Sequence, residues 1–266
     1  MLYLNGQPLV SPQLTIFPDK TSQVWKLPTS TYESNRHNIF WDFQSEAEIM
    51  HLAQLMDLLN SIPNGHTTLT IKCLPYARQD KRVENNATFA LRTFLKIINT
   101  MHFHKIIVTD PHNFDACRFG CQFQAVYPVK LLEQVAQSMG DNVILCYPDK
   151  GAVSKYVTVY ESLYRPHIYG EKVRDQLTGN ILSYQVVGEC AGKDVLIVDD
   201  ICDGGMTFKI LAKDLLAAGA KSVVLFVTHG IFSKGLQTLK DSGIQRIYTQ
   251  DGEASECDGQ IIYRRL

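Results

Sequence analysis

The hydrophobic positions of this chain form two alternating patterns: short unbroken apolar runs, and longer stretches with apolar residues at helical spacing. An unbroken apolar run that stops at polar residues is typical of a buried parallel strand. The run at 195–198 is of this kind, and other segments rich in apolar residues predict strands at 14–17, 24–27, 39–43, 69–74, 105–109, 142–147, 181–187 and 221–227. Helical spacing predicts helices at 45–59, 88–99, 128–139 and 208–218. Because strands alternate with helices, the sequence predicts an α/β fold with parallel sheets.

Size and composition limit the possible function classes. A chain of 266 residues with 45% hydrophobic residues can form one large or two ordinary α/β domains. The formal net charge of -1 provides no field that attracts nucleic acid or an anionic membrane. No apolar run approaches the ~20 residues of a membrane helix, and the start of the chain lacks a signal-peptide pattern. We therefore expect a cytoplasmic protein with reduced thiols that binds neither nucleic acid nor membranes.

The strand at 195–198 ends at two adjacent carboxylates, Asp199 and Asp200. In open α/β sheets ligands bind at the carboxyl ends of the strands, and carboxylates accept hydrogen bonds from sugar hydroxyls. The loop that leads into the next helix contains Asp203, Gly204, Gly205, Met206 and Thr207. A loop that enters a helix N-terminus can bind phosphate, so the stretch predicts a ligand with a ribose and a phosphate. The plainer alternative is that the aspartates end a strand and the glycines turn the chain.

A second polar block follows the strand at 69–74. It spells Tyr76, Ala77, Arg78, Gln79, Asp80, Lys81 and Arg82. Three cations and an amide beyond a strand end suit a polyphosphate, because guanidinium groups bind phosphate oxygens in a bidentate way. A charged run of this kind is also a common solvated loop. Composition alone leaves both interpretations open.

Two further strand ends and one polar segment carry candidate chemistry. His112 follows the strand at 105–109 and lies at the edge that binds ligands, although a lone histidine is more often structural. Asp149 follows the strand at 142–147. The segment at 170–179 is polar, is flanked by glycines and contains Lys172 and Arg174. It predicts a mobile loop that acts as an active-site lid, and a plain solvated hairpin is the alternative.

These motifs resemble those of a known enzyme family. The stretch from Asp199 to Thr207 resembles the phosphoribosyl-pyrophosphate (PRPP) loop of type I phosphoribosyltransferases and ribose-phosphate pyrophosphokinases. The block from Tyr76 to Arg82 resembles the ATP-binding signature of ribose-phosphate pyrophosphokinases, which ordinary phosphoribosyltransferases lack. Partial matches at 148–152 and 228–233 follow in the same order. The chain is therefore similar, over most of 14–266, to the ribose-phosphate pyrophosphokinase family, as a short and divergent member.

The resemblance implies a fold and a reaction. The fold would be two phosphoribosyltransferase type I-like α/β domains with parallel sheets, related by a pseudo-twofold axis. The domain at 1–130 would bind ATP, and the domain at 131–266 would bind ribose 5-phosphate. The reaction would be ribose-phosphate diphosphokinase activity, in which ATP and ribose 5-phosphate give PRPP and AMP with Mg²⁺ as the cofactor. Family members also assemble, which implies a homo-oligomer, either a dimer or a hexamer.

The resemblance also implies roles for single residues. Lys172 and Arg174 would close over the transferred diphosphate as catalytic residues, and His112 and Asp149 would line the Mg²⁺. The residues implied for ATP binding are Phe17, Asp19, Thr21, Arg78, Gln79 and Asp80. The residues implied for ribose 5-phosphate binding are Arg174, Asp199, Asp200, Asp203, Gly204, Gly205, Met206 and Thr207.

Two departures from the family pattern affect these sites. Lys20 and Thr21 replace the family's Gly and Glu beside Phe17 and Asp19, which leaves the adenine contact and the preference for ATP open. Met206 replaces a Gly of the sugar-phosphate loop; methionine is tolerated there at negative φ and strained at positive φ. The alternative functions are a phosphoribosyltransferase that consumes PRPP and a non-catalytic regulator that resembles a pyrophosphokinase.

Overall fold

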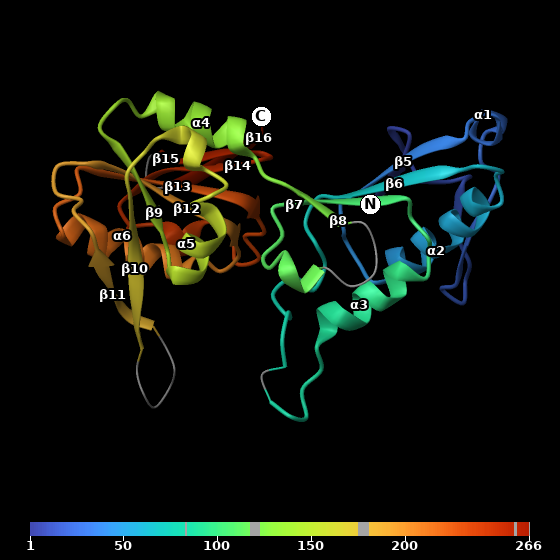
Figure 1. Ribbon diagram of the computed structural model, residues 1–266, viewed down its shortest axis with the longest axis horizontal. Helices are drawn as coiled ribbons and strands as arrows, with labels where there is room; N and C mark the ends of the chain where they lie inside the picture. Colours follow the sequence, from blue (N-terminus) through green and yellow to red (C-terminus); the bar gives the residue numbers. More distant parts are fainter. Residues whose placement is uncertain (83, 118–122, 175–180, 258–259, 266) are drawn as a thin grey trace. The chain divides into compact units, whose positions relative to one another are not determined.

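The computed structural model describes residues 1–82, 84–117, 123–174, 181–257 and 260–265. The chain divides into two compact units, unit 1 (Met1–Val126) and unit 2 (Tyr127–Leu266). Each unit contains a largely parallel sheet with helices packed on it (Figure 1). The predicted α/β class, with parallel sheets in two domains, is therefore confirmed. The assignment of 1–130 to ATP and of 131–266 to ribose 5-phosphate stays a prediction.

Unit 1 is built on a sheet with the strand order β2-β1-β5-β6-β7-β8. Strands β5 to β8 are parallel, and the two N-terminal strands pair antiparallel at one edge. The strands are β1 (Leu2–Leu4), β2 (Gln7–Pro8), β5 (Arg36–Trp41), β6 (His66–Ile71), β7 (Lys105–Thr109) and β8 (Phe123–Val126), with a separate hairpin of β3 (Leu14–Ile16) and β4 (Ser22–Val24). The helices are α1 (Thr29–Glu33), α2 (Ala47–Asn60), α3 (Ala90–Asn99) and the 3-10 turn η1 (Asp115–Cys117).

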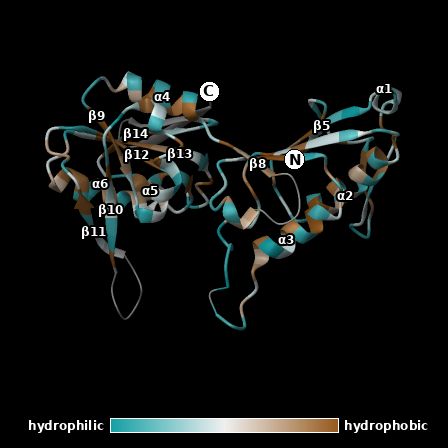
Figure 2. Cartoon of the chain, in the orientation of Figure 1, coloured by the Kyte–Doolittle hydropathy of each residue, from teal (hydrophilic) through white to brown (hydrophobic). Residues whose placement is uncertain are grey.

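One face of this sheet forms the core of unit 1. Because successive residues of a strand point to opposite faces, β5 buries His37, Ile39 and Trp41 and leaves the residues between them exposed. The neighbouring strands and the two long helices complete the core with Leu69, Ile71, Ile106, Val108, Leu52, Leu55, Leu91 and Phe94. Figure 2 shows hydrophobic and hydrophilic positions alternating along α2 and α3, as expected of helices with one buried face.

Unit 2 is built on a sheet with the strand order β11-β10-β9-β12-β13-β14-β15-β16. The central strands β10, β9, β12, β13 and β14 are parallel, and the outer strands pair antiparallel. The strands are β9 (Val143–Tyr147), β10 (His167–Arg174), β11 (Ile181–Val187), β12 (Asp194–Cys202), β13 (Ser222–Gly230), β14 (Ile244–Thr249), β15 (Gly252–Cys257) and β16 (Gln260–Arg265). The helices are α4 (Val129–Ser138), α5 (Lys150–Tyr156), α6 (Met206–Ala217) and the 3-10 turns η2 (Glu161–Leu163) and η3 (Gln237–Leu239).

The sheet of unit 2 has helices on both faces, and β12 separates two clusters of buried side chains. Ile197 shares one cluster with residues of α6, and Val198 shares the other with residues of α4 and α5. This arrangement explains the unbroken apolar run of β12, since a strand buried on both faces needs apolar residues at every position. The same alternation places Asp199 on the α6 face and Asp200 on the α4 and α5 face.

Several predicted boundaries are wrong, and three of them bear on the candidate site. β12 does not end at Val198 but continues to Cys202, because it stays paired with β13 up to Gly230. The polar segment at 170–179 does not begin as a loop, because β10 continues to Arg174 and pairs with β11. The helix after the glycines begins at Met206 instead of at 208. Within the described residues, no helix is both long and apolar enough to cross a lipid bilayer.

Candidate functional site

The predicted sugar-phosphate loop connects the carboxyl end of β12 to α6. Gly205 is the N-cap of α6 and has a φ of 74°, a left-handed conformation that glycine adopts without strain. A Cβ atom at Gly205 would lie 3.0 Å from the side chain of Leu239. Met206 is the first helical residue, and its φ is negative, so a methionine is tolerated there. The loop therefore leads directly to the first-turn amides of α6, including that of Thr207.

The segment after β13 holds Asp203 at the start of this loop. Asp203 Oδ1 accepts hydrogen bonds from the Ser233 amide, at 3.3 Å, and from the Ser233 hydroxyl. The amides of Ile231 and Phe232 donate to the Cys202 carbonyl, at 2.8 and 3.2 Å. The loop after β12 and the segment after β13 are thus hydrogen-bonded to each other.

Asp199 and Asp200 are adjacent but have different surroundings. Burial, together with the neighbouring Asp200 carboxylate, raises the pKa of Asp199 well above its usual value. Asp200 is only 4% exposed. Its Oδ2 lies 3.3 Å from Nζ of Lys155, a residue in the last turn of α5. One carboxylate is therefore ion-paired beneath the edge, and the other lies on the opposite face of the strand.

Asp149 caps α5 and pairs with the predicted catalytic lysine. Its Oδ1 accepts a hydrogen bond from the Ala152 amide at 3.0 Å, and its Oδ2 lies 2.5 Å from Lys172 Nζ. Burial alone would raise the pKa of Asp149. The hydrogen bonds from Lys172 and from the amide outweigh burial and hold that pKa below its usual value.

Lys172 lies on a strand. It pairs with Tyr184 in the antiparallel hairpin of β10 and β11, which extends past the parallel part of the sheet. Arg174 ends β10, where its backbone pairs with Ile181. The rest of the predicted lid, at 175–179, lies outside the described residues. Strand pairing therefore determines where the backbone of Lys172 lies.

The parallel strands bring these groups of unit 2 to one edge of the sheet. Strand β9 makes its last pairs at Tyr147, with Tyr169 of β10, and at Cys146, with Ile197 of β12. Asp149, Lys172, Asp199 and Asp200 all follow within three residues of these positions. The carboxyl edge of unit 2 thus carries an ammonium group, three carboxylates and a loop that leads to a helix N-terminus.

In unit 1, the Tyr76–Arg82 block forms a turn beyond the end of β6. Arg78 and Gln79 are exposed, and the Gln79 amide donates to the Tyr76 carbonyl at 2.9 Å. Asp80 Oδ2 accepts a hydrogen bond from Asn113 Nδ2 at 2.8 Å. Asn113 directly follows His112 in the turn after β7, so the hydrogen bond joins the polyphosphate block to the segment that contains the predicted metal ligand.

The predicted adenine contacts lie in the turn of the β3–β4 hairpin. Asp19 Oδ1 accepts hydrogen bonds from the Thr21 amide at 3.0 Å and from the Thr21 hydroxyl at 2.7 Å, and these bonds lower the pKa of Asp19. Phe17 is 38% exposed. Lys20 has a φ of 68°, a conformation that favours the glycine of the family pattern. The hairpin is attached to α2 through Gln54, whereas the Arg78 turn adjoins Asn113.

The residues present suit a magnesium ion that is held mainly by substrate. Within the described part of the chain, no group of three or more His, Cys, Asp or Glu side chains gathers to form a metal cage. Mg²⁺ usually keeps several waters and binds to one or two carboxylates together with substrate phosphates. Asp149 offers such a carboxylate at the edge of unit 2, and His112 lies in unit 1.

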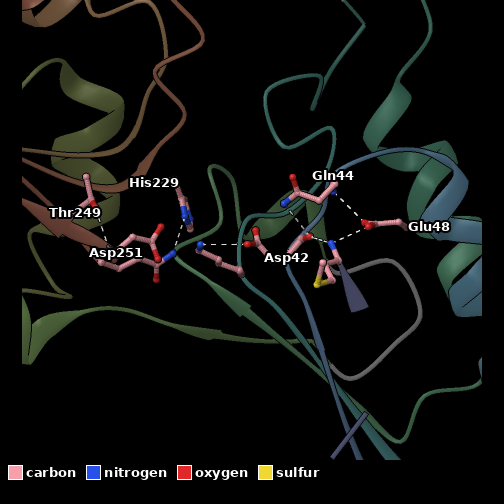
Figure 3. Close-up of polar contacts among 9 residues, drawn as sticks. Asp42, Gln44, Glu48, His229, Thr249 and Asp251 are labelled. Atoms are coloured by element: carbon pink, nitrogen blue, oxygen red, sulfur yellow. Dashed lines mark hydrogen bonds and ion pairs between the residues drawn. The ribbon is translucent and has the colours of Figure 1, made fainter. Parts of the chain in front are cut away.

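Figure 3 shows polar clusters of both units, each of which supports its own strand ends. In unit 1, Glu48 Oε2 accepts hydrogen bonds from Trp41 Nε1 and the Gln44 amide, both at 2.9 Å. In unit 2, His229 lies near the end of β13, and its Nδ1 is 3.1 Å from Nε2 of Gln250. The histidine of the 228–233 motif is thus held within the fold.

Comparison with known proteins identifies the family. The chain is 25% identical to the ribose-phosphate pyrophosphokinase of Saccharolobus solfataricus over 244 residues, which cover 90% of this chain and 84% of that protein. It is 27% identical to that of Thermococcus kodakarensis over 232 residues, which cover 86% of this chain and 81% of the relative. It is 31% identical to that of Pyrococcus abyssi over 183 residues, which cover 68% and 63%.

The chain belongs to the ribose-phosphate pyrophosphokinase family. It is a divergent member, and no protein-family model matches it. The crystal structure of phosphoribosylpyrophosphate synthetase from Mycobacterium smegmatis superimposes with a TM-score of 0.67 at 25% identity, covering 76% of this chain and 67% of that chain. The family resemblance predicted from the Tyr76–Arg82 and Asp199–Thr207 motifs is therefore confirmed.

Sequence analysis missed two residues that shape this pyrophosphokinase-like site. Lys155 pairs with Asp200, and Ser233 bonds to Asp203. Ser233 ends the 228–233 motif, so its position did carry a signal. Lys155 carried none, because α5 has only 7 residues, which is too short for apolar spacing to reveal a helix.

Proposed function

We propose that the chain is a ribose-phosphate diphosphokinase, which transfers the β,γ-diphosphoryl group of ATP to the C1 hydroxyl of ribose 5-phosphate and forms PRPP and AMP. The observation that carries this proposal is the carboxyl edge of unit 2. There, Lys172 lies beside Asp149, and the Asp199–Thr207 loop leads into α6. The family membership of the chain supports the same reaction.

The sugar phosphate binds along the loop in this proposal. Asp199 accepts hydrogen bonds from the ribose hydroxyls, and the backbone between Asp203 and Thr207 surrounds the 5-phosphate at the N-terminus of α6. Gly205 supports this role, because its left-handed φ lets the chain turn into the helix where a side chain would meet Leu239. Binding of this kind places the C1 hydroxyl in a fixed position for attack, which is a large part of catalysis in phosphoryl-type transfers.

Lys172 stabilises the charge that develops during transfer. As the C1 oxygen attacks the β-phosphorus and the bond to AMP breaks, negative charge spreads over the diphosphoryl oxygens and the leaving oxygen. An ammonium group that is positioned before the reaction lowers the barrier without needing to reorganise. In the structure, Lys172 Nζ lies 2.5 Å from Asp149 Oδ2. Arg174, two residues further along β10, is the second proposed cation.

Asp149 in unit 2 and His112 in unit 1 are the residues proposed to contact Mg²⁺, each beside substrate phosphates. When bound, the ion neutralises phosphate charge and orients the oxygens of the diphosphate. Asp149 already has its Oδ1 fixed by the Ala152 amide, so the carboxylate is oriented before any ion binds.

ATP binds to unit 1 in this proposal. Arg78 and Gln79 contact its phosphates from an exposed turn, and Asp80 fixes that turn through Asn113. Phe17, Asp19 and Thr21 contact the base. Because Lys20 and Thr21 depart from the family pattern, the donor preference for ATP is part of the proposal. So are a homo-oligomeric state, a dimer or a hexamer, and a cytoplasmic location.

Phosphorus NMR of the purified protein with Mg²⁺, ATP and ribose 5-phosphate tests the proposal. We expect the PRPP and AMP resonances to rise together while those of ATP fall. Parallel samples with GTP and CTP test the altered base site. If ATP stays intact although ribose 5-phosphate binds, the chain is a regulator or uses another donor. If added PRPP disappears only when a nucleobase is present, the chain is a phosphoribosyltransferase.

A further inference from the structure

A buried ion pair lies directly beneath the sugar-binding edge of unit 2. Lys155 Nζ and Asp200 Oδ2 are 3.3 Å apart, and their side chains are 15% and 5% exposed. The ammonium group also lies 4.7 Å from the centre of the Tyr156 ring. Tyr156 belongs to the buried cluster that includes Val198 of β12. The pair is therefore built into the core on the α4 and α5 face of the sheet.

Burial of this pair carries a desolvation cost that lowers the stability of the fold. Removing two charges from water costs several kcal/mol for each ion, and apolar residues at such positions often give equal or greater stability. In the centre of β12 the chain does use apolar residues, since Val195 to Val198 are completely buried. A charged pair at the position next to Asp199 is therefore better explained by the site than by the stability of the core.

Helix α5 connects this pair to the catalytic side of the edge. Its N-cap, Asp149, binds Lys172 of β10, and its last turn carries Lys155, which binds Asp200 of β12. Asp149 and Lys155 are six residues apart along α5, which corresponds to a rise of about 9 Å along the helix axis. The helix thus links the strand of the proposed catalytic lysine, at its N-cap, to the strand of Asp199 and Asp200, at its last turn.

We propose that Lys155 is a positioning residue for ribose 5-phosphate. It holds Asp200 against α5, so that Asp199 alone of the two carboxylates is directed to the ribose hydroxyls. It also offsets one negative charge at an edge that must accept a phosphate and a diphosphate. This inference rests on the proposed function, because it assigns Lys155 to the sugar subsite of that reaction.

Calorimetric titration of ribose 5-phosphate, with Mg²⁺ present, into wild-type protein and the Lys155→Met variant tests the proposal. Loss of an outer partner that orients a ligand group costs about 10–100-fold in affinity at metal sites, and we expect at least a tenfold loss of sugar-phosphate affinity here. Steady-state kinetics should show a raised KM for ribose 5-phosphate with little change in the KM for ATP. Lys155→Arg, which keeps the cation, should restore sugar-phosphate binding.

The matched control is Lys221→Met. Lys221 pairs with Asp194 at 3.1 Å, so it is also a lysine bound to an aspartate of β12, but at the amino end of the strand. We expect its affinity for ribose 5-phosphate to equal that of the wild type. If Lys155→Met is too unstable to assay, the double variant Lys155→Met/Asp200→Asn removes both charges and should still bind the sugar phosphate weakly.

The outcomes separate this inference from the proposed function. Wild-type affinity in Lys155→Met or in the double variant would overturn the positioning role while leaving the proposed reaction intact. A lower melting temperature with unchanged KM for ribose 5-phosphate would also overturn it, because the pair would then serve only the core. Failure of the wild-type protein itself to bind ribose 5-phosphate would overturn the proposed function.

Discussion

The carboxyl edges of the two sheets are built in different ways. In unit 2, the polar side chains at the edge are held by partners within the fold: Asp149 by Lys172, Asp200 by Lys155, and Asp203 by Ser233. In unit 1, the comparable edge presents Arg78, Gln79 and His112 on exposed turns, with the hydrogen bond between Asp80 and Asn113 joining two of those turns.

This difference matches the proposed ligands. A bound sugar phosphate must direct its C1 hydroxyl toward the β-phosphorus of the donor. This orientation requires carboxylates and amides in fixed positions. A triphosphate chain is flexible and highly charged, so exposed cations on turns can bind it with less exact geometry. We therefore propose that unit 2 sets the geometry of the reaction and that unit 1 supplies affinity for the donor. The variants below test this division.

The largest effect is expected for Lys172→Ala. Removing one preorganised donor from a transition state typically lowers kcat by about 10²–10³-fold. Because the proposed ribose contacts lie on β12 and its loop, the affinity for ribose 5-phosphate should stay within about twofold of the wild-type value, which corresponds to less than 0.5 kcal/mol. Steady-state kinetics and calorimetry of the same samples measure both quantities.

The control for this variant is Lys193→Ala. Lys193 is exposed at the amino end of the same sheet, where its Nζ donates to Asn142 Oδ1 at 2.8 Å. Its kcat should equal that of the wild type. Turnover that persists in Lys172→Ala would contradict the catalytic role of the lysine and the idea that unit 2 controls the chemical step.

The second variant, Arg78→Ala, tests the role of unit 1. Hydrogen bonds to charged groups contribute about 1.5–3 kcal/mol, so the KM for ATP should rise about 10–100-fold. The KM for ribose 5-phosphate should not change. Arg36→Ala is the control, since Arg36 is an exposed residue at the amino end of β5. A raised KM for both substrates would show that the two edges do not divide the substrates as proposed.

The third test compares Gly205→Ala with Gly204→Ala, two adjacent positions of the sugar-phosphate loop. Gly205 has a φ of 74° and contacts Leu239, whereas a Cβ at Gly204 would meet only a flexible lysine side chain at 4.0 Å. A left-handed backbone costs a non-glycine residue about 1–2 kcal/mol. Thermal unfolding should therefore show Gly205→Ala about 2–8 °C less stable than the wild type, and Gly204→Ala close to it. Equal melting temperatures would mean that the loop is less rigid than the comparison requires.

Sequence patterns predicted the scaffold of both edges because the relevant signals are local. The unbroken apolar run at 195–198 indicated a strand buried on both faces, and the adjacent glycines indicated the turn into α6. The run at 105–109 matches β7 at both ends. Motif spelling indicated the family because it identifies residue types that a fold alone does not require.

The contacts that separate the two edges were not predictable, because they depend on pairing between distant segments. Lys172 was expected in a loop, yet pairing of β10 with β11 places it on a strand. Lys155 lies 45 positions before Asp200 in the sequence and meets it only because β9 and β12 are neighbours. The predicted end of β12 was wrong for the same reason, since pairing with β13 extends the strand through both aspartates.

The smallest expected effect concerns Glu48, a half-buried carboxylate of unit 1. Burial by itself would raise the pKa of Glu48, but hydrogen bonds from the N-terminal ammonium group, Trp41 and the Gln44 amide outweigh burial and lower that pKa. A lowered folded-state pKa stabilises the protein above the unfolded value of about 4.3, and this contribution is lost as the pH falls through the folded value. Glu48→Gln should therefore be about 1 kcal/mol less stable than the wild type at pH 6, and the gap should close below about pH 4.

Urea unfolding followed by tryptophan fluorescence measures this gap at each pH, since Trp41 contacts Glu48 directly. Glu33→Gln, a change at the exposed end of α1, should show no such pH-dependent difference. The KM for ATP should be the same in Glu48→Gln as in the wild type, because the Glu48 contacts support β5 and α2 and the Arg78 turn follows β6. A changed KM for ATP would mean that a carboxylate held within the fold takes part in binding in unit 1 as well. The contrast between an edge fixed by ion pairs and an edge of exposed turns would then no longer explain how the two substrates are divided.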